Sequence, residues 1–197
     1  MMFGFLYCLI TERSAYRQPL HEVARQAEKA RVDYFQLREK DLTPAELLEI
    51  AQHVRSMLVH TKLIVNGQLD VAIASGADGV HLQKDNLPVA AVRRTFPKLQ
   101  IGYSAHSREE MEQAQNDGAD YVFISPVFVP QSKPSSVSPL GTETISKWIA
   151  GMRIPVFGLG GITAENISAL AACGCAGAAA ISLFIEKGYF SSKGMVV

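Results

Sequence analysis

The sequence predicts a parallel α/β barrel in which eight strands alternate with helices. Two observations carry this prediction: short apolar runs of β-forming residues alternate with segments of helical periodicity along the chain, and there are eight such runs. A third observation is a joint that recurs where a helix gives way to a strand, as in Ser-Gly-Ala-Asp-Gly at 75–79 and Asp-Gly-Ala-Asp-Tyr at 117–121. We therefore expect a (β/α)8 TIM barrel, and an open doubly wound sheet is the alternative.

The predicted strands are apolar at most positions, as is typical of parallel strands covered on both faces. In chain order they span 5–11, 34–38, 62–66, 79–83, 100–104, 121–128, 155–160 and 178–182. The predicted helices span 19–30, 44–58, 68–75, 88–95, 107–117, 142–150 and 164–172. Thr43 before Pro44 and the pair Ser107 and Glu110 are helix N-terminal signals, the second with the spacing of a capping box. Only 183–189 suits an eighth helix, so the last helix is expected to be short or truncated.

Length and charge limit the classes of function. The 197 residues suit one domain, so we expect a single barrel over 1–197. There are 19 Lys and Arg against 19 Asp and Glu, which gives no net charge. A nucleic-acid binder would be expected to carry a basic excess, so nucleic acid is not expected as the main partner.

The cysteines and apolar segments indicate a cytoplasmic protein that does not enter a membrane. Cys8, Cys173 and Cys175 lie in apolar stretches and are expected to be buried and reduced, rather than paired or bound to zinc. The uncharged run 167–185 is rich in Ala and Gly and predicts buried core rather than a membrane span. Small barrels often associate, so a homo-oligomer remains an alternative to a monomer.

In a barrel of this kind the active site is built at the carboxyl ends of the strands. At the second strand, Gln36, Arg38 and Lys40 alternate toward one side. Three polar donors on one face of an otherwise apolar strand favour anion recognition, and a solvated strand end is the alternative.

The loops after the last two strands predict a phosphate site. Gly160 and Gly161 allow the backbone to approach an anion closely, and Ser182 adds a hydroxyl where such barrels often hold phosphate. The alternative is that the two glycines only make a tight turn. His106 follows the fifth strand and is either a proton carrier or a hydrogen-bonded structural group, whereas His81 lies within a strand and is expected to pack in the barrel.

Several motifs occur together and in order. They are Q-L-R-E-K at 36–40, V-N at 65–66, G-A-D-G-V-H-L at 76–82, S-x-H-S at 104–107, G-A-D-Y at 118–121, P-V-F-x-x-x-S-K-P at 126–134, G-G-I-T at 160–163 and I-S at 181–182. As a set they resemble the thiamine-phosphate synthase superfamily, which includes the TenI-type thiazole tautomerases. The resemblance covers about residues 4–187.

For a synthase, the resemblance implies a pyrimidine diphosphate bound with Mg2+ and a thiazole phosphate that captures the pyrimidine-methyl cation. The positions that match the diphosphate site are Gln36, Arg38, Lys40, Asn66, Ser104, Ser132 and Lys133. Those that match the thiazole-phosphate site are Gly160, Gly161, Ile181 and Ser182.

Two departures concern the metal. The family has Asp residues where this chain has Gly67 and Asn86, with Asp85 one residue earlier. Because Mg2+ favours anionic oxygen ligands, the metal site is expected to be weakened, and Asp85 is its remaining ligand if the chain is a synthase.

A third departure concerns proton transfer. The TenI-type pattern has its proton-transfer His where this chain has Pro126, so His106 or Lys133 would have to replace it. The main expectation is a thiazole tautomerase that needs no cofactor and acts on a small thiazole phosphate. The alternatives are a thiamine-phosphate synthase using Mg2+ and a non-catalytic binder that retains the phosphate pocket.

Overall fold

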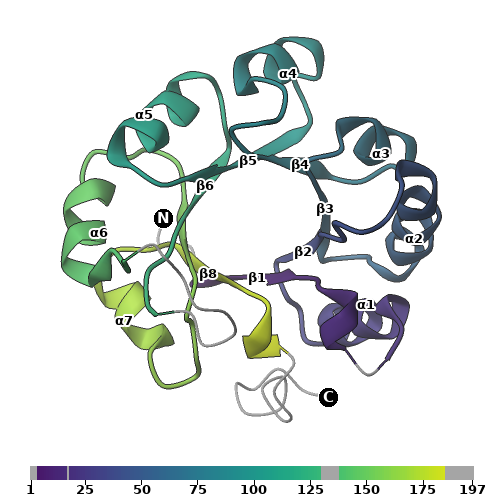
Figure 1. Ribbon diagram of the computed structural model, residues 1–197, viewed down its shortest axis with the longest axis horizontal. Coiled ribbons are helices and arrows are strands. Elements are labelled where there is room, and N and C mark those ends of the chain that lie inside the picture. The colour runs from purple at the N-terminus through teal and green to yellow at the C-terminus, as the bar shows by residue number, and fades with distance from the viewer. Residues whose placement is uncertain (1–3, 17, 130–137, 185–197) are drawn as a thin grey trace.

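The computed structural model describes residues 4–16, 18–129 and 138–184, and the structural statements below concern these residues. Eight parallel strands form a closed barrel in chain order, with β1 paired to β8 and helices around the outside (Figure 1). The predicted barrel is thereby confirmed, and the open sheet is excluded. No described helix is long and apolar enough to cross a membrane.

The strands are short and the helices alternate with them. The strands are β1 Leu6–Ile10, β2 Tyr34–Leu37, β3 Lys62–Asn66, β4 Gly79–Leu82, β5 Gln100–Ala105, β6 Tyr121–Ile124, β7 Val156–Leu159 and β8 Gly177–Ala180. The helices are α1 Leu20–Lys29, α2 Pro44–Met57, α3 Leu69–Ala74, α4 Val89–Thr95, α5 Arg108–Asn116, α6 Gly141–Ile149 and α7 Ile167–Ala172, with 3-10 turns η1 Arg13–Ala15 and η2 Ser182–Phe184.

Two elements differ from the prediction by more than two residues at one end. β6 ends at Ile124, and the amides of Val127 and Phe128 donate instead to the carbonyls of Leu159, the last residue of β7, and of Gly160, the residue after it. α7 begins at Ile167 because the Asn166 side chain accepts from the Thr163 amide and donates to the Gly161 carbonyl, which holds 164–166 in a turn. Of the predicted eighth helix, η2 is described and the part beyond Phe184 lies outside the described residues.

Strand alternation divides the apolar side chains into two packed groups. One fills the barrel interior, and its fully or almost fully buried members are Cys8, Ile10, Tyr121, Phe123, Phe157 and Ala179. The larger group lies between the strands and the surrounding helices. The three cysteines are free and buried, as predicted.

The repeated joint has a structural role at the amino ends of the strands. Three joints contain an aspartate, and its carboxylate accepts a hydrogen bond from a backbone amide of the preceding strand. These joint aspartates are Asp33, bonded to the Tyr7 amide at 2.8 Å, Asp78, bonded to Leu63 at 2.8 Å, and Asp120, bonded to Ile101 at 2.7 Å. The corresponding residue of the last joint is Ala176, whose amide donates to the Val156 carbonyl as the Asp120 amide donates to that of Ile101, but which has no carboxylate.

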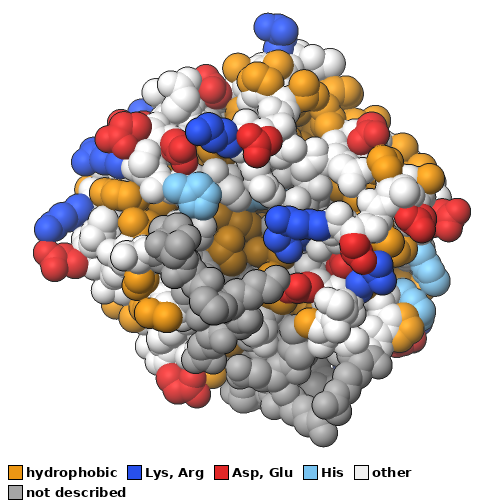
Figure 2. All heavy atoms as spheres, in the orientation of Figure 1, with side chains coloured by type: hydrophobic (Ala, Val, Ile, Leu, Met, Phe, Trp, Pro, Cys, Tyr) orange, Lys and Arg blue, Asp and Glu red, His pale blue; other side chains and the backbone are white. Residues whose placement is uncertain are grey.

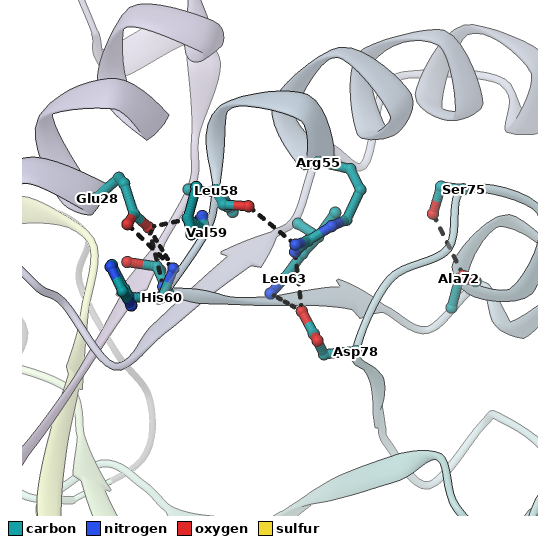
Figure 3. A network of polar contacts seen from close by, with 10 residues as sticks. Glu28, Arg55, Leu58, Val59, His60, Leu63, Ala72, Ser75 and Asp78 are labelled. Carbon is teal, nitrogen blue, oxygen red and sulfur yellow. Dashed lines mark hydrogen bonds and ion pairs between the residues drawn. The ribbon is translucent and has the colours of Figure 1, made fainter.

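Polar contacts also fix the helices beside β3 and β4 (Figure 3). Arg55 on α2 donates to Asp78 at 3.0 Å and to the Leu58 carbonyl at 2.9 Å. Glu28 on α1 accepts from the backbone amides of Val59, His60 and Thr61 at distances between 2.9 and 3.1 Å. A carboxylate at the end of one helix therefore orders the loop that follows the next.

Candidate active site

A cavity of about 380 Å³ lies at the carboxyl ends of the strands. Figure 2 looks onto this end and shows a hollow with apolar atoms at its floor and basic and histidine side chains near its rim. Its apolar lining is Ile10, Phe123, Leu159 and Ile181. The predicted polar residues that line it are Gln36, Arg38, Asn66, Asp85, Ser104 and His106, and Gln83, Lys84 and Glu110 join them.

A network of side-chain amides lies on one wall of the cavity. The Asn66 Oδ1 atom accepts from Gln36 Nε2 at 2.9 Å and from Gln83 Nε2 at 3.1 Å. Gln36 is only 2 % exposed, so its side chain is held within the barrel. Because the Asn66 oxygen is engaged, its amide nitrogen is the group that can donate to a ligand.

Two cations line the cavity, but they are not the pair that strand alternation predicts. Arg38 is half-buried and lines it, whereas Lys40 is exposed and is not among its lining residues. The reason is that β2 ends at Leu37, so the alternation does not continue to Lys40. Lys84, from the loop after β4, is the second cation.

The described residues do not form the two-carboxylate magnesium site that the resemblance implies. A Cβ on Gly67 would lie 3.3 Å from Asn86 Nδ2, so the two positions are neighbours, and neither carries a charge. Asn86 Oδ1 accepts from the Gln83 amide at 2.8 Å and holds the loop. Asp85 is exposed at the cavity rim, and no group of three or more His, Cys, Asp or Glu among the described residues could hold a metal ion.

His106 is oriented with one ring nitrogen available. Its Nδ1 atom lies 3.0 Å from the Ser125 carbonyl oxygen. A carbonyl only accepts, so Nδ1 carries the proton and Nε2 of the neutral ring is an acceptor. The His106 amide donates to Glu110 Oε2 at 2.7 Å, while Ser107 Oγ accepts from the Glu110 amide at 3.2 Å. Ser107 therefore makes its hydrogen bond of the predicted capping box. The Glu110 carboxylate does not return a bond to the Ser107 amide and instead accepts from the amide of His106, the residue before the cap.

The two glycines after β7 are explained by close packing with the chain itself. Gly160 and Gly161 have φ of +95° and +64°, which favours glycine. A Cβ on Gly161 would lie 2.5 Å from the Val129 carbonyl oxygen in the loop after β6. Neither glycine lines the cavity, and Ser182 is exposed. No hydrogen bond between described residues uses the amide of Gly161 or that of Ser182.

Two predicted site residues, Ser132 and Lys133, lie outside the described residues. Gln83, Lys84 and Glu110 were not predicted as site residues. Gln83 and Lys84 directly follow β4, at the barrel end where such active sites are built, so their position was a usable signal. Glu110 carried no separate signal because its spacing from Ser107 is that of a helix cap.

Comparisons with known proteins agree with this geometry. A thiamine-phosphate synthase from Moorella thermoacetica is 36 % identical over 183 residues, which cover 91 % of this chain and 87 % of that protein. One from Chlorobium luteolum is 39 % identical over 180 residues, or 90 % of this chain and 84 % of that protein. The structure of a thiamine phosphate pyrophosphorylase from Pyrococcus furiosus superposes with a TM-score of 0.85 at 28 % identity, covering 98 % of this chain and 93 % of the other. The model of a protein family described as "Thiamine monophosphate synthase" matches residues 6–184, and the chain belongs to this family.

Proposed function

We propose that this chain is a transferase of thiamine biosynthesis that joins a pyrimidine diphosphate to a thiazole phosphate. The names of the two relatives and of the matched structure support the synthase reading better than the tautomerase reading that was our main expectation. The observation that carries the proposal is the cavity itself, in which Arg38 and Lys84 lie above an apolar floor at the carboxyl ends of the strands. Two cations beside an apolar surface suit a substrate made of a diphosphate and a heterocycle.

The proposed reaction breaks the bond between the pyrimidine methylene carbon and the diphosphate oxygen. Arg38 and Lys84 would stabilise the charge of the leaving diphosphate, and the thiazole nitrogen would donate its electron pair to the methylene carbon. Gln36, Asn66 and Gln83 would orient the polar edge of the pyrimidine. Ser132 and Lys133 remain proposed contacts.

The thiazole phosphate is proposed to bind after β7 and β8. The amides of Gly161 and Ser182 would donate to its oxygens, with Gly160 setting the turn and Ile181 lining the cavity beside it. Family membership keeps Mg2+ as the expectation for a synthase. Gly67 and Asn86 carry no charge, so Asp85 at the cavity rim is the carboxylate proposed to hold the ion.

A second candidate is the tautomerase, and the geometry of His106 favours it. The Nε2 atom is an acceptor in the cavity, and the ring lies beside the Ser125 carbonyl, one residue before Pro126. His106 could therefore take and return the proton that the tautomerisation moves.

Assaying both reactions, with Mg2+ and with a chelator, tests the proposal. We expect diphosphate release that requires both substrates, and a His106→Gln variant that retains most of it. Aromatisation of a carboxylated thiazole phosphate without coupling, slowed about 100-fold or more in His106→Gln, would instead establish the second candidate. Thermal stabilisation by thiazole phosphate without either turnover would leave only a binding protein.

A further inference from the structure

Beneath the cavity, three strands bring together polar side chains that the proposed reaction leaves without a role. His81 on β4 and Tyr121 on β6 are each 1 % exposed. His81 Nε2 lies 2.8 Å from Ser104 Oγ on β5, and its Nδ1 lies 3.4 Å from the Tyr121 hydroxyl. Ser104 lines the cavity, so the three side chains run from the barrel interior to the ligand space.

Gly102, between them on β5, makes this arrangement possible. A Cβ at this position would lie 2.2 Å from Tyr121 Cζ, 2.4 Å from its hydroxyl oxygen and 2.5 Å from His81 Nδ1. The Tyr121 ring and the His81 ring therefore occupy the space that any other residue at 102 would fill.

Both interior groups are neutral. Burial lowers the pKa of His81 to about 3. Burial also raises the pKa of Tyr121 well above its ordinary value, with minor contributions from neighbouring groups. A neutral imidazole has one N–H, so only two arrangements are available: His81 donates to Ser104 from Nε2, or to Tyr121 from Nδ1.

The Tyr121 hydroxyl decides between them. The hydrogen bonds between described residues offer its proton one acceptor, His81 Nδ1. If Nδ1 carried the proton, the buried phenol would be left without an acceptor, and an unsatisfied buried donor is costly. The favoured arrangement has Tyr121 donating to Nδ1 and Nε2–H donating to Ser104 Oγ. The proton of Ser104 is then free to point into the cavity.

We propose that Tyr121 and His81 form a buried relay that fixes the Ser104 hydroxyl as a hydrogen-bond donor to the substrate. Ser104 then recognises an acceptor atom, a phosphate oxygen or a ring nitrogen. His81 and Tyr121 act through Ser104 and are positioning residues. The arrangement of the relay stands on the interior geometry alone, and only its effect on turnover rests on the proposed function.

Nitrogen-15 NMR of the full chain tests the relay without any assay of activity. His81, identified by the signals lost in His81→Gln, is expected to be protonated at Nε2 and not at Nδ1, and to show no titration between pH 5 and pH 8, about the range in which ordinary histidines change charge. A proton on Nδ1, or titration within that range, would overturn the proposal.

A double-mutant cycle tests its effect on the reaction. Tyr121→Phe is expected to lower kcat/KM about threefold to tenfold when Ser104 is present and to cause no further loss in the Ser104→Ala background. His81→Gln, which keeps an N–H donor in reach of Ser104, is expected to retain more activity than His81→Leu. Equal losses from Tyr121→Phe in both backgrounds would overturn the relay. Absence of turnover in the unmodified chain would count against the proposed function, and the NMR result would then decide the relay by itself.

Discussion

Arg38 and Lys84 are the cations that the diphosphate of the proposed reaction would meet at the cavity rim. The backbone of Arg38 is held in position at the end of β2, because its amide donates to Thr11 Oγ1 at 2.9 Å. The guanidinium can then offer paired donors to phosphate oxygens, which the ammonium of Lys84 cannot.

Replacing Arg38 by Ala is expected to lower kcat/KM for the diphosphate substrate at least tenfold, because hydrogen bonds to charged groups contribute about 1.5–3 kcal/mol. Lys40→Ala is the matched control, since Lys40 is exposed outside the cavity lining, and its effect is expected to stay within about twofold. Steady-state kinetics of both variants measure this. Equal losses would show that Lys40 also contacts the substrate.

The Asn86→Asp variant adds a carboxylate beside Gly67 while keeping an oxygen that accepts from the Gln83 amide. We expect Mg2+ to bind at least about tenfold more tightly in the presence of inorganic diphosphate, because the ion gains an anionic oxygen ligand. Isothermal titration of the variant and the unmodified chain measures the change. Unchanged affinity would show that position 86 does not face the bound ion.

Single side chains also show where sequence reasoning stops. Asn66, Ser104 and His106 were placed in the site because they lie at or just after the carboxyl ends of strands, and each lines the cavity. Lys40 was included by extending the alternation of a strand past its last residue. The direction in which Glu110 points depends on the His106 amide, a contact that spacing does not reveal.

At the scale of elements, the joint aspartates join neighbouring strands at their amino ends. Asp120 accepts from the Ile101 amide and is paired with Arg93, which also donates to the carbonyls of Gly118 and Leu99. One carboxylate therefore links β6 to β5 and to α4.

Asp120→Ala is expected to lower the free energy of unfolding by about 1–2 kcal/mol, because the Ile101 amide loses its acceptor and Arg93 its partner. Asp70→Ala, at an exposed position of α3, is the control and is expected to change the free energy of unfolding by less than about 0.5 kcal/mol. Urea denaturation measures both. Similar values for the two variants would mean that the joint aspartate adds nothing to stability.

Glu28 makes stability depend on pH. Burial opposes its ionisation, but hydrogen bonds from the backbone amides of Thr61, His60 and Val59 outweigh it and hold its pKa below the ordinary 4.5. A lowered folded-state pKa stabilises the fold above the unfolded value, and this contribution is lost as pH falls through the folded one. The unmodified chain should therefore exceed Glu28→Gln in stability at pH 7, and the difference should shrink below about pH 4.5, as measured by urea denaturation. A difference independent of pH would contradict this.

The boundaries of an element were predictable where neighbouring residues in the sequence determine them. They were not predictable where contacts between residues far apart in the sequence determine them. Thr43, Pro44 and Glu46 place the start of α2, and the capping box is formed there. β6 was predicted too long because Val127 and Phe128, which continue its apolar run, bond to the end of β7 and to the residue after it. Such pairing depends on the tertiary structure.

At the scale of the whole molecule, closure of the barrel depends on small residues in β8. The β8 sequence is Gly-Ala-Ala-Ala, and it lies beside the aromatic interior formed by Tyr121, Phe123 and Phe157. Strand count and the repeated joint were enough to predict closure. The packing of side chains in the interior could not be predicted, because it depends on which ring from one strand faces a small residue on another. Gly102, beside the rings of Tyr121 and His81, is an example.

Gly177→Ala is expected to destabilise the barrel by about 3 kcal/mol, because its Cβ would lie 2.5 Å from the Leu6 carbonyl oxygen and 2.6 Å from the Phe157 ring. Gly4→Ala is the control, since a Cβ there has nothing within 4 Å. Thermal unfolding of the two variants measures the difference. An unchanged midpoint for Gly177→Ala would mean that β1 and β8 can separate without cost.

The joint aspartates and the cavity lie at opposite ends of the same strands, one before each strand begins and the other where it stops. Anchoring and reactivity are thus carried by different residues of one scaffold. The residues that line the cavity could therefore be exchanged in protein engineering while the joint aspartates are kept. In this architecture, a change of chemistry need not lower the stability of the fold.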